Sequence, residues 1–242
     1  MTTGVAQLRA DVLAALARPG VPGGTDVVGQ VCRACARLLP VNGAALSVVS
    51  GAGHQQTIYA SDATSAALAD LQFSLGEGPC CQANATGEAV LVPDLARGSV
   101  LSWPVFAGQA AQQPVAALFT FPVRVGAVQV ATLDTYRATA GALTSAELST
   151  AWQVADVAGW TLPSFATAER PLLDAGGRLP ETAVRWHREI HQATGVLIAQ
   201  LDLPAAAALA RMRAYAFGRG RSLAEVAAGI VSGRLRLDLE PD

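Results

Sequence analysis

The chain has 242 residues, 51% of them hydrophobic, which is enough for one large domain or two small ones with a buried core. The formal net charge is −2, so the protein as a whole is neither polybasic nor strongly acidic. All 17 basic residues are arginine, whose planar guanidinium stacks on bases and grips phosphate through paired hydrogen bonds.

The N-terminal residues carry no signal for export. Residues 1–17 form an amphipathic pattern interrupted by Arg9 and Asp11, and no basic segment leads into an apolar run with a cleavage site. No uncharged apolar stretch reaches the length of about 18 residues that a membrane-spanning helix needs. We therefore expect a cytoplasmic protein that does not enter a membrane, with its four cysteines as reduced thiols.

Helices and strands alternate in the first part of the chain. Helical patterns cover 5–17 and 25–39, and Pro40 ends the second one. A further helix is expected at 61–71, with Ser61-Asp62 as its cap. Two strands are expected before it, at 43–50 and 55–61. A loop that leads into a short helix is expected after it, at 76–88.

Three more strands and a long helix follow. The strands are expected at 89–95, 114–125 and 128–137, and Gly126 marks the turn between the last two. Thr144 and Glu147 have the spacing of a capping box, which opens a helix that runs to about Leu162.

The order of these elements predicts an α+β fold with a separate C-terminal part. A sheet of roughly five strands with helices before, within and after it is typical of that class. The segment 163–180 contains Gly176-Gly177 and three prolines, which indicates a linker. We therefore expect a first domain at 1–162 and a second at 181–242.

Four ordered motifs lie in the first domain. They are LGEGPC at 75–80, VPDL at 92–95, WPVF at 103–106 and VATLDTYR at 130–137. As an ordered set they resemble a GAF domain of the kind common in actinobacterial regulators, over 25–162. The resemblance implies an antiparallel sheet with flanking helices, which binds a small molecule, a cyclic nucleotide or a tetrapyrrole, or which serves only for dimerisation.

Candidate ligand-binding residues of this domain come from the same motifs, and they are Glu77, Cys80, Trp103 and Phe106. Cys80 and Cys81 lie in the loop expected beside a ligand, where a sensing thiol, a chromophore attachment and a purely structural loop all remain open. Cys32 and Cys35 have CxxC spacing within a helical pattern. We expect them to pack on one helix face, because the adjacent cysteines are a poor second pair for zinc.

The chain beyond 181 predicts three helices separated by short turns, at 181–201, 204–217 and 222–235. Pro204 opens the second helix, where its missing N–H is not needed. Ser222 and Glu225 form a second capping box at the start of the third. Apolar residues of the second and third helices are expected to pack together, namely Leu209, Met212 and Tyr215 against Leu223, Val226 and Ile230.

Three ordered motifs in these helices resemble an ANTAR domain. They are HQATGVLI at 191–198, RMR at 211–213 and SLAEVA at 222–227, followed by Ile230-Val231. The resemblance implies a dimeric protein that binds hairpins in nascent RNA and prevents a terminator from forming. The candidate RNA-binding residues are Ala193, Thr194, Gly195, Arg213, Arg219, Arg221 and Ser222.

The charge distribution supports contact with a phosphate backbone. Residues 184–236 hold eight arginines and three acidic residues, a net charge of +5, so the rest of the chain carries −7. Gly195 inside a helix costs about 1 kcal/mol relative to alanine, which indicates close approach by a neighbouring helix or by a base. Thr194 stands where the family often has lysine, and 205–208 lacks the usual acids, so the arginines are expected to carry more of the binding.

A DNA-binding regulator is the first alternative. It would place the third helix in the major groove, but AEVAAGIVSG at 224–233 offers few side chains able to read base edges.

An enzyme is the second alternative, and it is disfavoured because the sequence lacks phosphate-binding, nucleophile and metal motifs. His187 and His191 lie one turn apart without the HExxH order, so no metal, catalytic residue or cofactor is expected. We favour a one-component sensor, since no phosphoacceptor domain is apparent.

Overall fold

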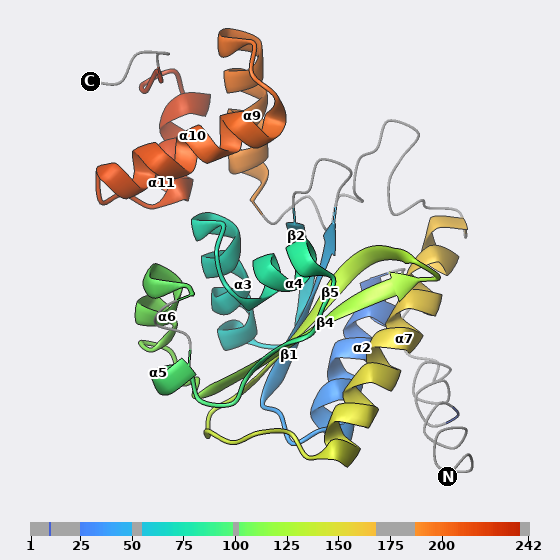
Figure 1. Cartoon of the computed structure of the whole chain (residues 1–242). Coiled ribbons are helices and arrows are strands. Elements are labelled where there is room, and N and C mark those ends of the chain that lie inside the picture. Colours follow the sequence, from blue (N-terminus) through green and yellow to red (C-terminus); the bar gives the residue numbers. More distant parts are fainter. Residues whose placement is uncertain (1–9, 11–24, 50–54, 99–101, 168–186, 238–242) are drawn as a thin grey trace. The chain divides into compact units, whose positions relative to one another are not determined.

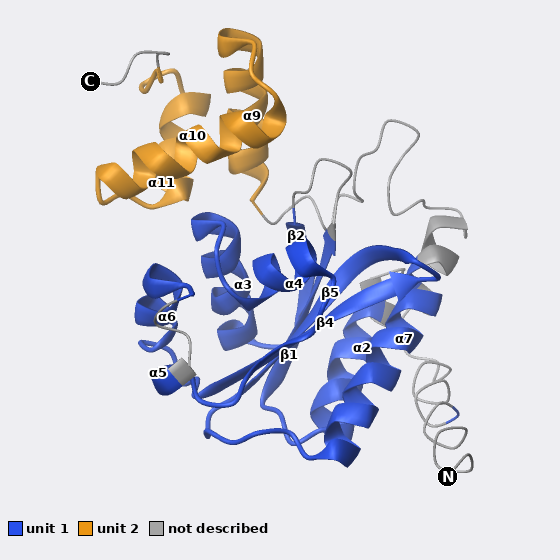
Figure 2. Ribbon diagram, viewed as in Figure 1, with its two compact units in different colours: residues 1–50, 55–183 blue, residues 51–54, 184–242 orange. Residues whose placement is uncertain are grey.

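The computed structural model describes residues 10, 25–49, 55–98, 102–167 and 187–237. The chain divides into two compact units, residues 1–50 with 55–183 and residues 51–54 with 184–242 (Figure 2). The expected helix at 5–17 and most of the expected linker lie outside the described residues. Each unit is considered by itself below.

The first unit is built on a five-stranded antiparallel sheet in the order β2-β1-β5-β4-β3 (Figure 1). Its strands are β1 (Gly43–Val49), β2 (Gln55–Ala60), β3 (Val90–Val92), β4 (Ala117–Val125) and β5 (Val128–Arg137). The β4–β5 hairpin closes through two residues, and Gly126 takes a positive φ of 61° that suits the twist of such a turn. The α+β class and the five expected strands are confirmed.

Helices cover both faces of this sheet, as Figure 1 shows. On one face lie α2 (Thr25–Leu38) and α7 (Ser145–Thr167), which pack on β1, β4 and β5. On the other lie α3 (Ala63–Leu75), α4 (Pro79–Thr86) and α6 (Pro104–Ala110), with the short α5 (Leu95–Gly98) beside them. Because β4 is covered on both sides, Ala117–Val123 is buried without interruption, as its apolar run requires.

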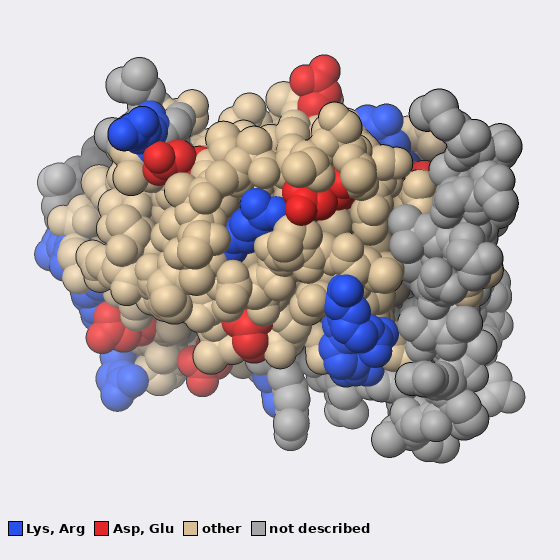
Figure 3. Space-filling model, turned by 90° about the horizontal axis from the view of Figure 1, so that it is seen from below, with Lys and Arg blue, Asp and Glu red and all other residues tan. Residues whose placement is uncertain are grey.

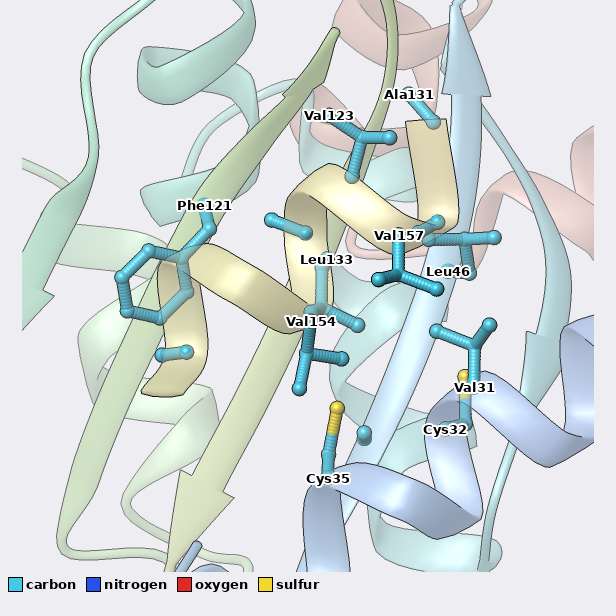
Figure 4. Close-up of a cluster of buried hydrophobic side chains, with 14 of the residues drawn as sticks. Val31, Cys32, Cys35, Leu46, Phe121, Val123, Ala131, Leu133, Val154 and Val157 are labelled. Carbon is cyan, nitrogen blue, oxygen red and sulfur yellow. The ribbon is translucent and has the colours of Figure 1, made fainter. Parts of the chain in front are cut away.

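The core beneath α2 and α7 contains two thiols. Figure 4 shows Cys32 and Cys35 of α2 among apolar side chains from α7 and the sheet, including Leu46, Leu133 and Val154. Both cysteines are fully buried, and burial raises the pKa of Cys35 to about 12, so it stays a neutral thiol. The prediction that this CxxC pair packs on one helix face is confirmed. Among the described residues, no group of three His, Cys, Asp or Glu side chains is arranged to hold a metal.

Helix α7 begins at the predicted capping box. Thr144 N donates to Glu147 Oε2 at 2.7 Å, and Glu147 N donates to Thr144 Oγ1 at 3.3 Å. The helix packs closely on β4, where a Cβ at Gly159 would overlap the carbonyl oxygen of Arg124. It continues through Pro163 to Thr167, beyond the end expected at Leu162, so the first part of the expected linker is helical.

The second unit contains α9 (Arg188–Leu201), α10 (Ala205–Gly218) and α11 (Leu223–Val231), which pack against one another. Helix α9 begins at Arg188, after His187 takes a left-handed conformation with φ 61°, and the part of the expected helix at 181–186 lies outside the described residues. Pro204 is the N-cap residue of α10 rather than its first helical residue. The predicted packing partners Leu209, Met212, Leu223, Val226 and Ile230 are all buried, and Tyr215 is half-buried.

Candidate functional site

The turn between α10 and α11 has a fixed backbone. The N–H of Arg221 donates to Ala216 O at 2.9 Å, and the N–H of Gly220 donates to Phe217 O at 3.2 Å. Gly220 between them has a left-handed φ of 60°. This is a Schellman motif, which satisfies the last carbonyls of α10 and fixes the path of the chain into α11. The candidate residues Arg219 and Arg221 are therefore held on a rigid turn.

Both arginines of this turn are exposed. The guanidinium carbon of Arg219 lies 5.3 Å from the ring centroid of Tyr215, a cation–π contact that orients the side chain without removing its charge. Arg213 lies on α10 and is half-buried. Residues four apart on a helix share a face, so Arg213 and Phe217 lie on one side of α10.

Phe217 was not a candidate from the sequence, yet it is 69% exposed at the end of α10. The helix buries Leu209, Met212 and Ala216 instead. Phe217 directly follows Ala216, so it lies outside the apolar stripe of the helix. Helical periodicity alone could therefore have predicted that Phe217 is exposed. An exposed aromatic ring between arginines gives this turn a surface on which a base can stack.

Ser222 caps α11 as predicted. Its Oγ accepts from Glu225 N at 3.2 Å, and Ser222 N donates to Glu225 Oε2 at 2.9 Å. That backbone hydrogen bond lowers the pKa of Glu225, so its carboxylate is charged at neutral pH. The start of α11 thus already holds an anionic group, which opposes binding of a phosphate to the first N–H groups of this helix.

The candidate residues on α9 have different environments. Ala193 is fully buried, and Thr194 is buried with its Oγ1 donating to Ile190 O at 2.7 Å. Gly195 is exposed, and a Cβ built on it would meet nothing within 4 Å. Packing within the described chain therefore does not require glycine here. Close approach by an RNA base at Gly195 stays a prediction.

Basic charge is not spread evenly. The +5 net charge of residues 184–236 contrasts with the −7 of the remaining chain. On the face shown in Figure 3, arginine and acidic side chains of the described residues lie scattered among neutral atoms, without one continuous area of either sign.

The first unit contains a small cavity of about 10 Å³ between α3, α4 and the sheet. Asp134 of β5 lines it, and Asp134 Oδ1 accepts from Thr120 Oγ1 at 2.5 Å. Asp134 Oδ2 is buried and has no hydrogen-bond partner among the described residues. Burial raises the pKa of this carboxyl to about 7. The sequence could not locate this cavity, because residues from distant segments form it.

The four candidate ligand residues do not line that cavity. Glu77 Oε1 accepts from Phe106 N at 2.6 Å, so the carboxylate caps the first turn of α6. Trp103 and Phe106 are buried and meet edge to face, with ring centroids 6.5 Å apart. Cys80 is buried, with its Sγ 3.0 Å from Gln55 Oε1, and burial raises the pKa of its thiol. Their geometry is that of a structural cluster, and a ligand contact at them stays a prediction.

Comparison with protein families assigns both parts of the chain. The model of the GAF domain matches residues 25–162, and the model of the ANTAR domain matches residues 181–231. The chain is a GAF and ANTAR domain-containing protein. The family resemblance inferred from the sequence motifs is thereby confirmed.

Solved structures support the GAF fold. A GAF domain from an Acinetobacter phosphoenolpyruvate-protein phosphotransferase matches with a TM-score of 0.54 at 9% identity, covering 70% of this chain and 98% of that one. The GAF domain of the corresponding Coxiella burnetii protein matches with a TM-score of 0.53 at 9% identity, covering 67% and 95%. At this identity they show the fold alone. The comparison with curated protein sequences gave no match.

These families define the broad role of the chain. ANTAR domains are RNA-binding domains of antitermination regulators, and GAF domains are sensory or dimerisation domains; both are regulatory rather than catalytic. Among the described residues, no single helix is long and apolar enough to cross a membrane, although α9 and α10 together, bent by 108°, meet the criteria of length and composition.

Proposed function

We propose that this protein regulates transcription antitermination by binding hairpins in nascent RNA through its ANTAR domain. The observation that carries the proposal is the rigid turn at the end of α10, which presents Arg219 and Arg221 beside an exposed aromatic ring. Hairpin loops offer unstacked bases and closely spaced phosphates, which aromatic rings and guanidinium groups bind.

Gly195 supplies a second point of approach on α9. Because its surroundings are open, RNA backbone or a base can come closer to the helix there than at any residue with a side chain. Thr194 does not take part directly, since its hydroxyl is bonded to the helix backbone. Binding thus depends on arginine, which compensates for the absent lysine at this position.

The GAF domain acts in this proposal as the sensor or dimerisation module of a cytoplasmic homodimer. A signal at the GAF domain changes dimerisation or the connecting segment, and so controls whether two ANTAR domains meet two hairpins together. When two binding domains are linked, binding of the first raises the effective concentration of the second at its site, and the joint affinity rises. A change in how the two ANTAR domains pair in the dimer is therefore enough to regulate RNA binding.

The DNA-binding alternative finds little support in α11. The exposed residues of this helix are Ala224, Glu225 and Val231, and the carboxylate of Glu225 is engaged in the capping box. Such a surface has no side chain suited to bidentate contact with a base in the major groove. Hairpin RNA is therefore the favoured partner.

The test is a titration of the full-length protein with a hairpin RNA and with duplex DNA of the same sequence, at several salt concentrations. We expect tighter binding of the hairpin, with an affinity that falls as salt rises because phosphate contacts release counterions. The R219A/R221A variant should bind at least about 10-fold more weakly and show a shallower salt dependence.

The matched control is R97A, because Arg97 is an exposed arginine of the GAF domain. It should bind like the wild type. Equal affinity of R219A/R221A and wild type, or preference for the duplex DNA, would contradict the proposal.

A further inference from the structure

The cavity of the GAF domain has the size of a single small group. Its walls include the apolar residues Leu68, Ala69, Pro79 and Leu118, from α3, α4 and β4. A volume of about 10 Å³ corresponds roughly to the space of one water molecule. A charged group in such a place has little solvent to stabilise it.

Only one of the two carboxyl oxygens of Asp134 has a hydrogen-bond partner among the described residues. Its Oδ1 accepts a hydrogen bond from Thr120 Oγ1 at 2.5 Å, from the neighbouring strand. Its Oδ2 is buried without a partner among the described residues. A buried acceptor without a donor costs free energy, so a donor is expected at this oxygen.

The nearby polar side chains are committed to other partners. Gln72 Oε1 accepts from Cys80 N at 2.7 Å. Tyr136 Oη donates to Asp62 Oδ1 at 3.1 Å, and Thr135 Oγ1 donates to a main-chain carbonyl of β4 at 3.1 Å. None of these hydrogen bonds reaches Oδ2 of Asp134, so a bound species with a donor can fill this position.

We propose that this cavity binds a protonated amine, either ammonium or the head group of a small primary amine, through Asp134 Oδ2. This inference rests on the proposed sensory role of the GAF domain and names the ligand class for it. An N–H donor satisfies the free oxygen, and the positive charge of the amine balances the buried carboxylate.

The groups around Asp134 leave it as the titrating residue of the site. Burial raises the pKa of the Cys80 and Cys32 thiols, the two cysteines that interact electrostatically with Asp134, and so keeps them neutral. Burial also raises the pKa of Tyr136. Because the pKa of Asp134 is about 7, its carboxylate is mostly charged at pH 8 and mostly protonated at pH 6. Amine binding should therefore be stronger at pH 8.

The experiment measures the unfolding temperature of the full-length protein at pH 8 in ammonium, methylammonium, tetramethylammonium or sodium chloride at equal ionic strength. A ligand that binds the folded state raises this temperature, so we expect an increase of about 3 °C in ammonium or methylammonium. A response to ammonium alone indicates the free ion, and a response to both indicates an amine head group. Tetramethylammonium has no N–H and should match sodium.

Two variants separate the site from general salt effects. D134N keeps the shape but removes the charge, and it should lose the response; D156N changes an exposed acid on α7 and should keep it. Equal responses to all four salts, or an undiminished response in D134N, overturn the inference. If D134N does not fold, the wild type decides: a shift that grows from pH 6 to pH 8 supports the inference, and a pH-independent shift overturns it.

Binding to hairpin RNA is measured on the same samples. RNA binding without any amine response overturns only the ligand inference, whereas loss of RNA binding overturns the proposed function.

Discussion

The backbone N–H of Arg221 donates to the carbonyl oxygen of Ala216 over 2.9 Å, and this bond closes α10 and directs the chain into α11. It is the outer bond of the Schellman motif at Gly220. The proposed RNA-binding arginines, Arg219 and Arg221, lie on either side of that glycine. We therefore expect local backbone geometry and RNA binding to be coupled in this turn.

The first prediction concerns Gly220. Alanine at a left-handed position costs about 1–2 kcal/mol, so G220A should lower the free energy of unfolding and weaken RNA binding by displacing the arginines. Chemical denaturation and RNA titration of the full-length variant measure both effects. G218A is the control, because Gly218 is helical and a Cβ there meets nothing within 4 Å. Equal behaviour of the two variants would count against the coupling.

The second prediction concerns the exposed ring of Phe217. Stacking of one base on an aromatic side chain contributes about 1–3 kcal/mol, so F217A should bind hairpin RNA about 10-fold more weakly. Its stability should change by less than about 0.5 kcal/mol, because the ring is 69% exposed. Fluorescence anisotropy with a labelled hairpin measures the affinity. V231A removes a 44% exposed side chain from α11 and should have no effect; unchanged affinity in F217A would exclude stacking there.

The third prediction concerns Gly195, whose replacement should raise the stability of the protein and lower its affinity for RNA. Replacing it with alanine should stabilise α9 by about 0.5–1 kcal/mol, because the Cβ enters open space and the helix propensity rises. The same Cβ should hinder close approach by RNA and lower the affinity. Denaturation curves and RNA titrations of G195A test the two signs. A stabilised variant with wild-type affinity would show that RNA does not approach this residue.

The fourth prediction is a pH dependence of stability in buffers free of amines. The pKa of Asp134 is about 7 in the folded protein, above the usual unfolded value of about 3.9. The folded state therefore binds the proton more tightly, and the contribution of this group to stability is lost as pH rises from about 4 to about 7. The D134N variant lacks this titration, so its unfolding temperature should exceed that of the wild type at pH 8 and approach it at pH 4. Parallel profiles for the two proteins would refute the shifted pKa.

Much of the fold follows from local signals in the sequence. The capping boxes at Thr144 and Ser222 fix helix starts because their side chains bond to the backbone three residues away. Gly126 indicates the β4–β5 turn from the sequence, because glycine readily takes the positive φ that the structure shows there. The helix end expected at Leu162 was wrong, because α7 continues through Pro163 to Thr167.

The candidate sites were less accessible from sequence. The hydrogen bond between Glu77 and Phe106 joins segments far apart in the chain, so the sequence did not reveal that Glu77 caps a helix. Its predicted ligand contact stays a prediction. Asp134 gave no sign of its unpaired oxygen, because its surroundings come from several distant segments. Arg219 and Arg221 are exposed, as RNA binding requires, and their contact with RNA stays a prediction.

The central claim, that this protein binds hairpins in nascent RNA through the α10–α11 turn, is tested most directly by crosslinking in cells followed by sequencing of the bound nucleic acid. For the wild type we expect RNA fragments that contain hairpin loops close to terminators, and for R219A/R221A we expect their loss at equal protein level. Recovery of DNA, of RNA without hairpins, or of the same fragments from both proteins would contradict it.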